Sequence, residues 1–138
     1  MKKLSILLLF VASLTSCSKK NTADCDGLIC DASFKYLVVN FVDKDGFGVP
    51  VTNYSAINQR TKDTVYSSLS QTANTTPGTF IVLDDAYRPK LSRSGDDIKV
   101  TGTSGTTKQV KSTILKVANP VCGCHFEKIS GEEIVKFD

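Results

Sequence analysis

The chain has 138 residues, of which 41% are hydrophobic and 22% are charged, with a formal net charge of +3. This length is enough for one domain with a modest core. The sequence contains no block of basic residues and no strong charge asymmetry, which argues against a nucleic acid as partner.

The first residues have the pattern of an export signal. Lys2 and Lys3 are followed by an apolar run from Leu4 to Leu14. As a helix these eleven residues would span roughly 17 Å, which is well short of the about 30 Å hydrocarbon core of a bilayer. Small residues follow the run. The pattern therefore predicts a signal peptide over residues 1–16 that is cleaved from the mature protein.

The end of this segment, Leu14-Thr15-Ser16-Cys17, resembles the lipobox of bacterial lipoproteins. The resemblance implies that Cys17 carries the lipid, that the chain is cut just before it, and that the membrane is a partner through this lipid. Ser18 rather than Asp follows the cysteine, which by the same resemblance favours the outer membrane of the cell envelope and leaves the membrane face open. The alternatives are an ordinary secretory signal and a buried N-terminal helix.

Removing residues 1–16 leaves 122 residues and, because Lys2 and Lys3 are lost, lowers the formal net charge to +1. Apart from Cys17, this chain contains four cysteines: Cys25, Cys30, Cys122 and Cys124. An even number in an exported protein predicts two disulfides, for which three connectivities exist. A bridge between Cys122 and Cys124 would be strained. We therefore expect Cys25 and Cys30 to pair with Cys122 and Cys124, with the choice between the two pairings left open.

Residues 17–32 are polar and form the predicted tether, and residues 33–138 form the predicted domain. Within it, β-branched and aromatic runs separated by Gly, Pro, Asn and Asp predict short strands. We expect them at residues 34–43, 51–59, 64–70, 79–83, around 98–100, 109–118, 121–129 and 134–137. The first has apolar residues on both faces and should be central in its sheet. This spacing predicts an all-β fold, a single antiparallel β-sandwich of seven or eight strands that is either transthyretin-like (prealbumin-like) or Ig-like.

The turn after the first predicted strand carries a second resemblance. Val42-Asp43-Lys44-Asp45-Gly46, followed by Pro50-Val51, resembles the first hairpin of carboxypeptidase regulatory-like and transthyretin-like domains. The closing sequence CHFEKISG also resembles the tails of small lipoproteins with that domain. The resemblance implies a seven-stranded sandwich without catalytic residues of its own. The alternative is a generic sandwich hairpin.

The sharpest chemical cluster is Cys122-Gly123-Cys124-His125. In an oxidising compartment, two disulfides explain its cysteines, while a redox or metal site for zinc or copper is the alternative. His125 is the only histidine, so a serine or cysteine hydrolase would have one candidate base. We therefore expect no catalytic residue, no cofactor and no metal.

Calcium is a further alternative. An EF-hand loop that uses Asp43-Lys44-Asp45-Gly46 fails, because Thr52, six residues after Gly46, occupies the position of the required Glu. The pairs Asp84-Asp85 and Asp96-Asp97 leave a different calcium site open, although such pairs also solvate the ends of strands.

A polar loop, residues 87–95, supplies the candidate binding residues Tyr87, Arg88, Lys90 and Arg93. The alternative is a loop that is simply solvated. Together these features predict a lipid-anchored envelope β-sandwich with a non-catalytic binding or structural role toward another envelope protein, a peptide or a glycan. The alternative is a redox or metal-handling lipoprotein that uses the Cys-Gly-Cys-His cluster.

Overall fold

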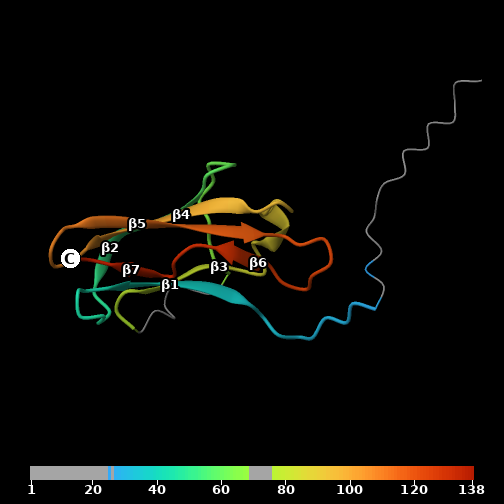
Figure 1. Ribbon diagram of the computed structural model, residues 1–138, viewed down its shortest axis with the longest axis horizontal. Helices are drawn as coiled ribbons and strands as arrows, with labels where there is room; N and C mark the ends of the chain where they lie inside the picture. The colour runs from blue at the N-terminus through green and yellow to red at the C-terminus, as the bar shows by residue number, and fades with distance from the viewer. Residues whose placement is uncertain (1–24, 26, 69–75) are drawn as a thin grey trace, which may run out of the picture.

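The computed structural model describes residues 25, 27–68 and 76–138, so the predicted signal peptide and Cys17 lie outside the described residues. The described part is all-β: seven strands form two open sheets that face each other (Figure 1). One sheet has the order β3-β1-β7 and the other the order β2-β4-β5-β6. The strands are β1 (Tyr36–Val42), β2 (Val51–Asn58), β3 (Thr79–Asp84), β4 (Asp96–Ser104), β5 (Val110–Ala118), β6 (Glu127–Ser130) and β7 (Ile134–Lys136), with a short 3₁₀ helix, η2 (Arg88–Lys90), between β3 and β4.

The predicted all-β, two-sheet architecture is confirmed, and β1 lies in the middle of its sheet as its two apolar faces predicted. Two of the predicted strands differ from the strands in the structure. In 64–70, the described residues 64–68 make only an isolated bridge between Ile57 and Thr64, and residues 69 and 70 lie outside the described residues. The prediction for 121–129 was wrong in its first half. β6 begins at Glu127 because the preceding residues bend around the two disulfide-bonded cysteines.

The prediction of a purely antiparallel sandwich was also wrong, because β1 and β7 pair in parallel. β6 and β7 run in the same direction in different sheets, so the chain between them crosses from one layer to the other instead of reversing (Figure 1). Gly131 makes this crossing with φ +106°, and a Cβ at this position would lie 2.3 Å from the carbonyl oxygen of Ile114. The crossing therefore requires glycine.

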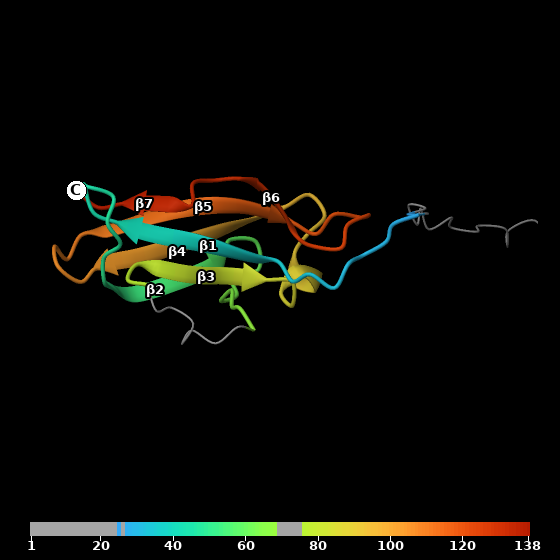
Figure 2. The same cartoon turned by 90° about the horizontal axis from the view of Figure 1, so that it is seen from below.

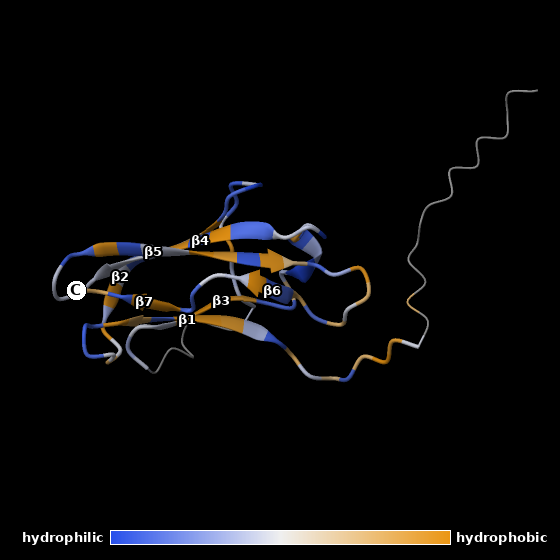
Figure 3. Ribbon diagram, viewed as in Figure 1, coloured by the Kyte–Doolittle hydropathy of each residue, from blue (hydrophilic) through white to orange (hydrophobic). Residues whose placement is uncertain are grey.

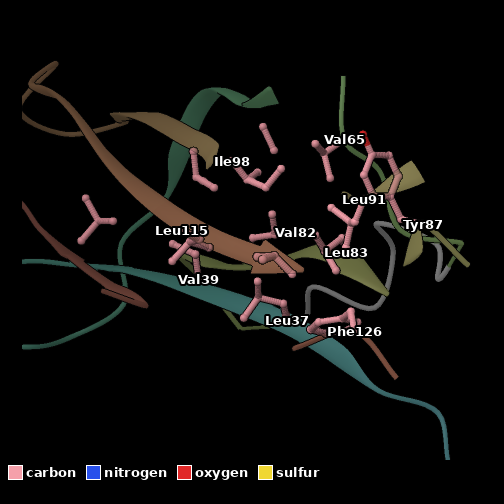
Figure 4. Close-up of a cluster of buried hydrophobic side chains, with 14 of the residues drawn as sticks. Leu37, Val39, Val65, Val82, Leu83, Tyr87, Leu91, Ile98, Leu115 and Phe126 are labelled. Atoms are coloured by element: carbon pink, nitrogen blue, oxygen red, sulfur yellow. The ribbon is translucent and has the colours of Figure 1, made fainter. Parts of the chain in front are cut away.

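The core fills the space between the sheets (Figure 4). In β1, Leu37, Val39 and Phe41 point inward and are buried, because side chains alternate along a strand. The other core residues come from all the remaining strands except β6 and from the loops: Ala56, Val65, Val82, Leu83, Tyr87, Leu91, Ile98, Val100, Leu115, Val117, Phe126, Val135 and Phe137. Phe41 anchors an aromatic group, with its ring centroid 5.8 Å from those of both Phe80 and Phe137.

The sandwich has two ends, and the distinction matters for the site. We call one the junction end: there the N-terminal segment enters β1, next to the β3–β4 connection and the β5–β6 connection (Figure 2). The other, which we call the far end, carries the loop 43–50, the β4–β5 turn and the C-terminus.

Candidate functional site: the disulfide junction

Two disulfides join the N-terminal segment to the β5–β6 connection. Cys25 is bonded to Cys122, and Cys30 is bonded to Cys124, with Cα–Cα distances of 5.5 and 5.4 Å. The predicted pairing between the two groups of cysteines is confirmed, and the choice left open is resolved. Both sulfurs of the Cys-Gly-Cys-His cluster are therefore in disulfides, so a redox or metal-handling role would first require a bridge to open. Among the described residues, no group of three or more His, Cys, Asp and Glu side chains is placed to hold a metal ion.

His125 connects three segments next to these bridges. Its Nδ1 lies 2.7 Å from Oδ2 of Asp85, and its Nε2 lies 3.3 Å from Oγ of Ser33 and 3.8 Å from Oδ1 of Asp31. Ser33 also donates its hydroxyl and its backbone N–H to Asp31. We call Asp31, Ser33, Asp85 and His125 the His125 clasp. It ties the N-terminal segment to the end of β3 and to the β5–β6 connection without covalent bonds.

Within the clasp, Asp85 is held by several hydrogen bonds. Its carboxylate accepts the backbone N–H of Lys35 at 2.7 Å and that of Phe126 at 3.3 Å, in addition to its contact with His125. Burial alone would raise the pKa of Asp85. The hydrogen bonds from Lys35, His125 and Phe126 outweigh burial, and the pKa of Asp85 lies below its ordinary value. Asp85 is therefore an anion that orders three neighbouring groups.

The clasp has the connectivity of a serine nucleophile, an imidazole and an orienting carboxylate. However, Asp31 also accepts the hydroxyl proton of Ser33, at 2.5 Å, compared with 3.3 Å from Ser33 Oγ to His125. The backbone N–H of Ser33 donates to Asp31 as well, so it is not directed toward a developing oxyanion. In this geometry the four side chains satisfy one another and act as a structural clasp.

Sequence reasoning missed Ser33, and it considered Asp85 only for a calcium site and not as a partner of His125. Ser33 and Asp85 lie 92 and 40 residues from His125 along the chain, and no motif connects them. One indication was present: Ser33 follows Cys30 closely and His125 directly follows Cys124. Once these two cysteines are paired, Ser33 and His125 must be near each other.

The candidate binding loop lies at the same end but does not present all four predicted side chains. Tyr87 is 1% exposed and packs edge-on against Tyr66, because the chain turns its ring inward just after β3. Arg88 donates to Asn119 Oδ1 at 2.8 Å and to the carbonyl oxygen of Cys124 at 3.0 Å, so it braces the disulfide region. Lys90 and Arg93 are exposed. A binding role of this loop stays a prediction, and these last two residues are its accessible part.

In each of the two aspartate pairs the first residue, Asp84 or Asp96, is buried, while Asp85 is partly buried and Asp97 is exposed. Asp84 accepts hydrogen bonds from Ser67, Ser68 and the backbone of Ala86. Asp96 is buried and accepts hydrogen bonds from Arg60, Asn58 and Ser92. The carboxylates of Asp84 and Asp96 therefore accept hydrogen bonds from donors within the protein.

The clasp predicts a measurable cost for Asp85→Asn. The amide keeps the shape but offers one acceptor oxygen in place of two. Depending on its orientation, either the N–H of Phe126 loses its acceptor, or the N–H of Lys35 and Nδ1 of His125 both lose theirs. We expect the free energy of unfolding to fall by about 1–3 kcal/mol, measured by urea denaturation at neutral pH. Asp97→Asn, at an exposed carboxylate of β4, is the control and should stay within about 0.5 kcal/mol of wild type. Equal effects of the two substitutions would contradict the clasp.

Comparison with known proteins adds no family assignment: no protein-family model, no curated protein and no solved structure matches this chain. In the part of the chain that the structure describes, no helix is long and apolar enough to cross a membrane. The two disulfides themselves suggest an oxidising location outside the cytoplasm.

Proposed function

We propose that this protein is a lipoprotein of the cell envelope, anchored by lipid on Cys17, whose β-sandwich has a non-catalytic binding or structural role. The leader and the lipobox resemblance support the anchor, and the two disulfides agree with export. Seven strands in two sheets agree with the resemblance to carboxypeptidase regulatory-like and transthyretin-like domains. The outer membrane is the proposed membrane.

The observation that carries the proposal is the position of the disulfide junction relative to Cys17. Cys25 is bonded into the domain and stands eight residues after Cys17, a distance that the extended chain spans in at most about 28 Å. A lipid on Cys17 would therefore keep the junction end close to the bilayer. The far end would point away from the bilayer, and Lys90 and Arg93 of the candidate binding loop would lie at the end nearer to it. The proposed partner is another envelope protein, a peptide or a glycan.

A non-catalytic role agrees with the way in which the reactive groups are used. The sole histidine, its two carboxylates and Ser33 bond to one another, and the four cysteines form disulfides. These groups stabilise the place where the tether meets the domain, which is a mechanical role suited to an anchored module.

Metabolic labelling with an alkyne-bearing palmitate in a Gram-negative host tests the anchor. Wild type and Ser18→Ala, a matched substitution next to the lipobox, should both be labelled. Cys17→Ala should lose the label completely, because no acceptor thiol remains at the cleavage site. Absence of label on wild type, or an equal label on Cys17→Ala, would contradict the proposal.

A further inference from the structure

The disulfide junction presents apolar side chains at its outer extremity. Leu28 and Ile29 lie between the bonded cysteines Cys25 and Cys30, and Val121 directly precedes Cys122. All three are exposed, and Ile29 is 92% exposed. We call these three residues the apolar tip. Figure 3 shows hydrophobic colouring in both segments beyond the ends of the strands.

The tip is a fixed feature. The N–H of Leu28 donates to the carbonyl oxygen of Cys25 at 3.1 Å, in a turn that Gly27 allows with φ +85°. One disulfide lies on each side of Leu28 and Ile29, so this loop is already ordered before it meets a ligand. Preorganisation removes much of the entropy cost of binding.

Further exposed aromatic rings follow the tip toward the body of the domain. Phe34 is half exposed, and Tyr36 at the start of β1 is also exposed. Single exposed apolar residues are ordinary in soluble proteins. Here, however, five of them lie at one end of the molecule, which is typical of a surface that meets an apolar partner. Tyrosine in particular is enriched at the boundary between lipid and water.

Two charged side chains beside the tip make contacts with the domain, although the Asp31 side chain is 76% exposed. Asp31 accepts hydrogen bonds from Ser33 and faces His125, so the clasp draws its carboxylate toward the domain. Lys35 donates to the carbonyl oxygen of Phe126 and lies over the ring of that residue. Asp26, which precedes Gly27 in the sequence, lies outside the described residues.

We propose that the apolar tip inserts into the interfacial layer of the bilayer to which Cys17 is anchored. This inference rests on the proposed function, because it takes the bilayer that anchors Cys17 as the partner of the tip. That bilayer must be close to the tip, since Cys25, whose disulfide holds the tip, stands only eight positions after Cys17. A lipid as the sole contact with the membrane would leave the domain free to tumble. A second, rigid contact fixes its orientation, with the far end pointing away from the membrane.

The chain contains no tryptophan, which permits a direct test with single-tryptophan reporters. The full, membrane-extracted protein carrying Ile29→Trp is reconstituted into phosphatidylcholine–phosphatidylglycerol vesicles with brominated acyl chains. Phe47→Trp is the matched control, because Phe47 is 71% exposed but lies in the loop at the far end. We expect a blue-shifted emission at position 29 that loses most of its intensity to bromine, and an unshifted, unquenched emission at position 47.

Equal and weak quenching at the two positions would overturn the proposal. Leu28→Trp serves as a second reporter, and mapping of the bonds from Cys25 to Cys122 and from Cys30 to Cys124 shows that each variant is folded. Adding Leu28→Asp to Ile29→Trp should reduce the quenching to the level of position 47.

Palmitate labelling of the same preparations separates the two proposals. A labelled protein without quenching at position 29 overturns the tip and leaves the anchor standing. An unlabelled protein that is nevertheless quenched at position 29 overturns the anchor and supports membrane contact by the tip.

Discussion

Removing both disulfides should lower the free energy of unfolding by about 7 kcal/mol, whereas removing either one alone should lower it by only about 2–3 kcal/mol. The bridges span 97 and 94 residues and lie side by side. When one is lost, the other still closes the long loop, and only a ring of about eight residues is opened. When both are lost, the unfolded chain also gains the entropy of the long loop, worth about 4–5 kcal/mol.

Urea denaturation of the exported protein measures these effects. The variants are Cys25→Ser with Cys122→Ser, Cys30→Ser with Cys124→Ser, and all four together. Because domains of this size are stable by about 5–15 kcal/mol, the quadruple variant should be unfolded or close to it at 37 °C. Ser94→Ala, at an exposed serine of the β3–β4 connection, is the control. Additive losses from the two bridges would contradict the shared-loop explanation.

Arg60→Met should lower the free energy of unfolding by about 2–3 kcal/mol, because it leaves the buried carboxylate of Asp96 without its cation. Arg60 donates through Nε at 2.6 Å and Nη2 at 2.8 Å, and the Asp96 side chain is fully buried while Arg60 is half exposed. Because Arg60 is half exposed and its charge is partly screened by water, we expect a smaller loss of free energy than for a fully buried ion pair. Lys111→Met, which removes an exposed pair with Asp138, should cost less than about 0.5 kcal/mol.

At acidic pH, the free energies of unfolding of wild type and Arg60→Met should differ less than they do at pH 7. The hydrogen bonds from Arg60, followed by those from Ser92 and Asn58, outweigh burial and hold the pKa of Asp96 well below its ordinary value. A carboxylate with a lowered pKa stabilises the fold fully above its unfolded pKa of about 3.9, and this contribution is lost as the pH falls toward the folded pKa. Denaturation curves at pH 7 and below pH 4 test this. A difference that stays constant or widens on acidification would contradict the assignment to Asp96.

Local chemistry predicted much of the fold and part of the site. The alternation in Gln109 to Ala118 predicted β5 almost to the residue, and the doubly apolar first strand predicted the central position of β1. That Cys25 and Cys30 pair with Cys122 and Cys124 followed from compartment and strain, whereas the choice between the two possible pairings came only from the structure. The polar composition of the loop at 87–95 concealed the buried ring of Tyr87, because one aromatic residue that turns inward leaves no periodic pattern.

The remaining features depend on tertiary contacts between distant residues. His125 meets Ser33 and Asp85 only after the disulfides bring the N-terminal segment against the β5–β6 connection. Arg60, two residues after the end of β2, meets Asp96 at the start of the neighbouring strand β4. The parallel pairing of β7 with β1 depends on a change of sheet at Gly131, which in the sequence is simply one more glycine at a turn.

The measurement that bears most directly on this account is the intact mass of the mature protein extracted from the envelope. We expect a chain that begins at position 17, carries the added mass of diacylglycerol and an amide-linked acyl chain, and is four hydrogens lighter than the reduced chain because of its two disulfides. A chain that still contains residues 1–16, or one that begins at position 17 without lipid, would contradict the anchored, oxidised module proposed for this protein.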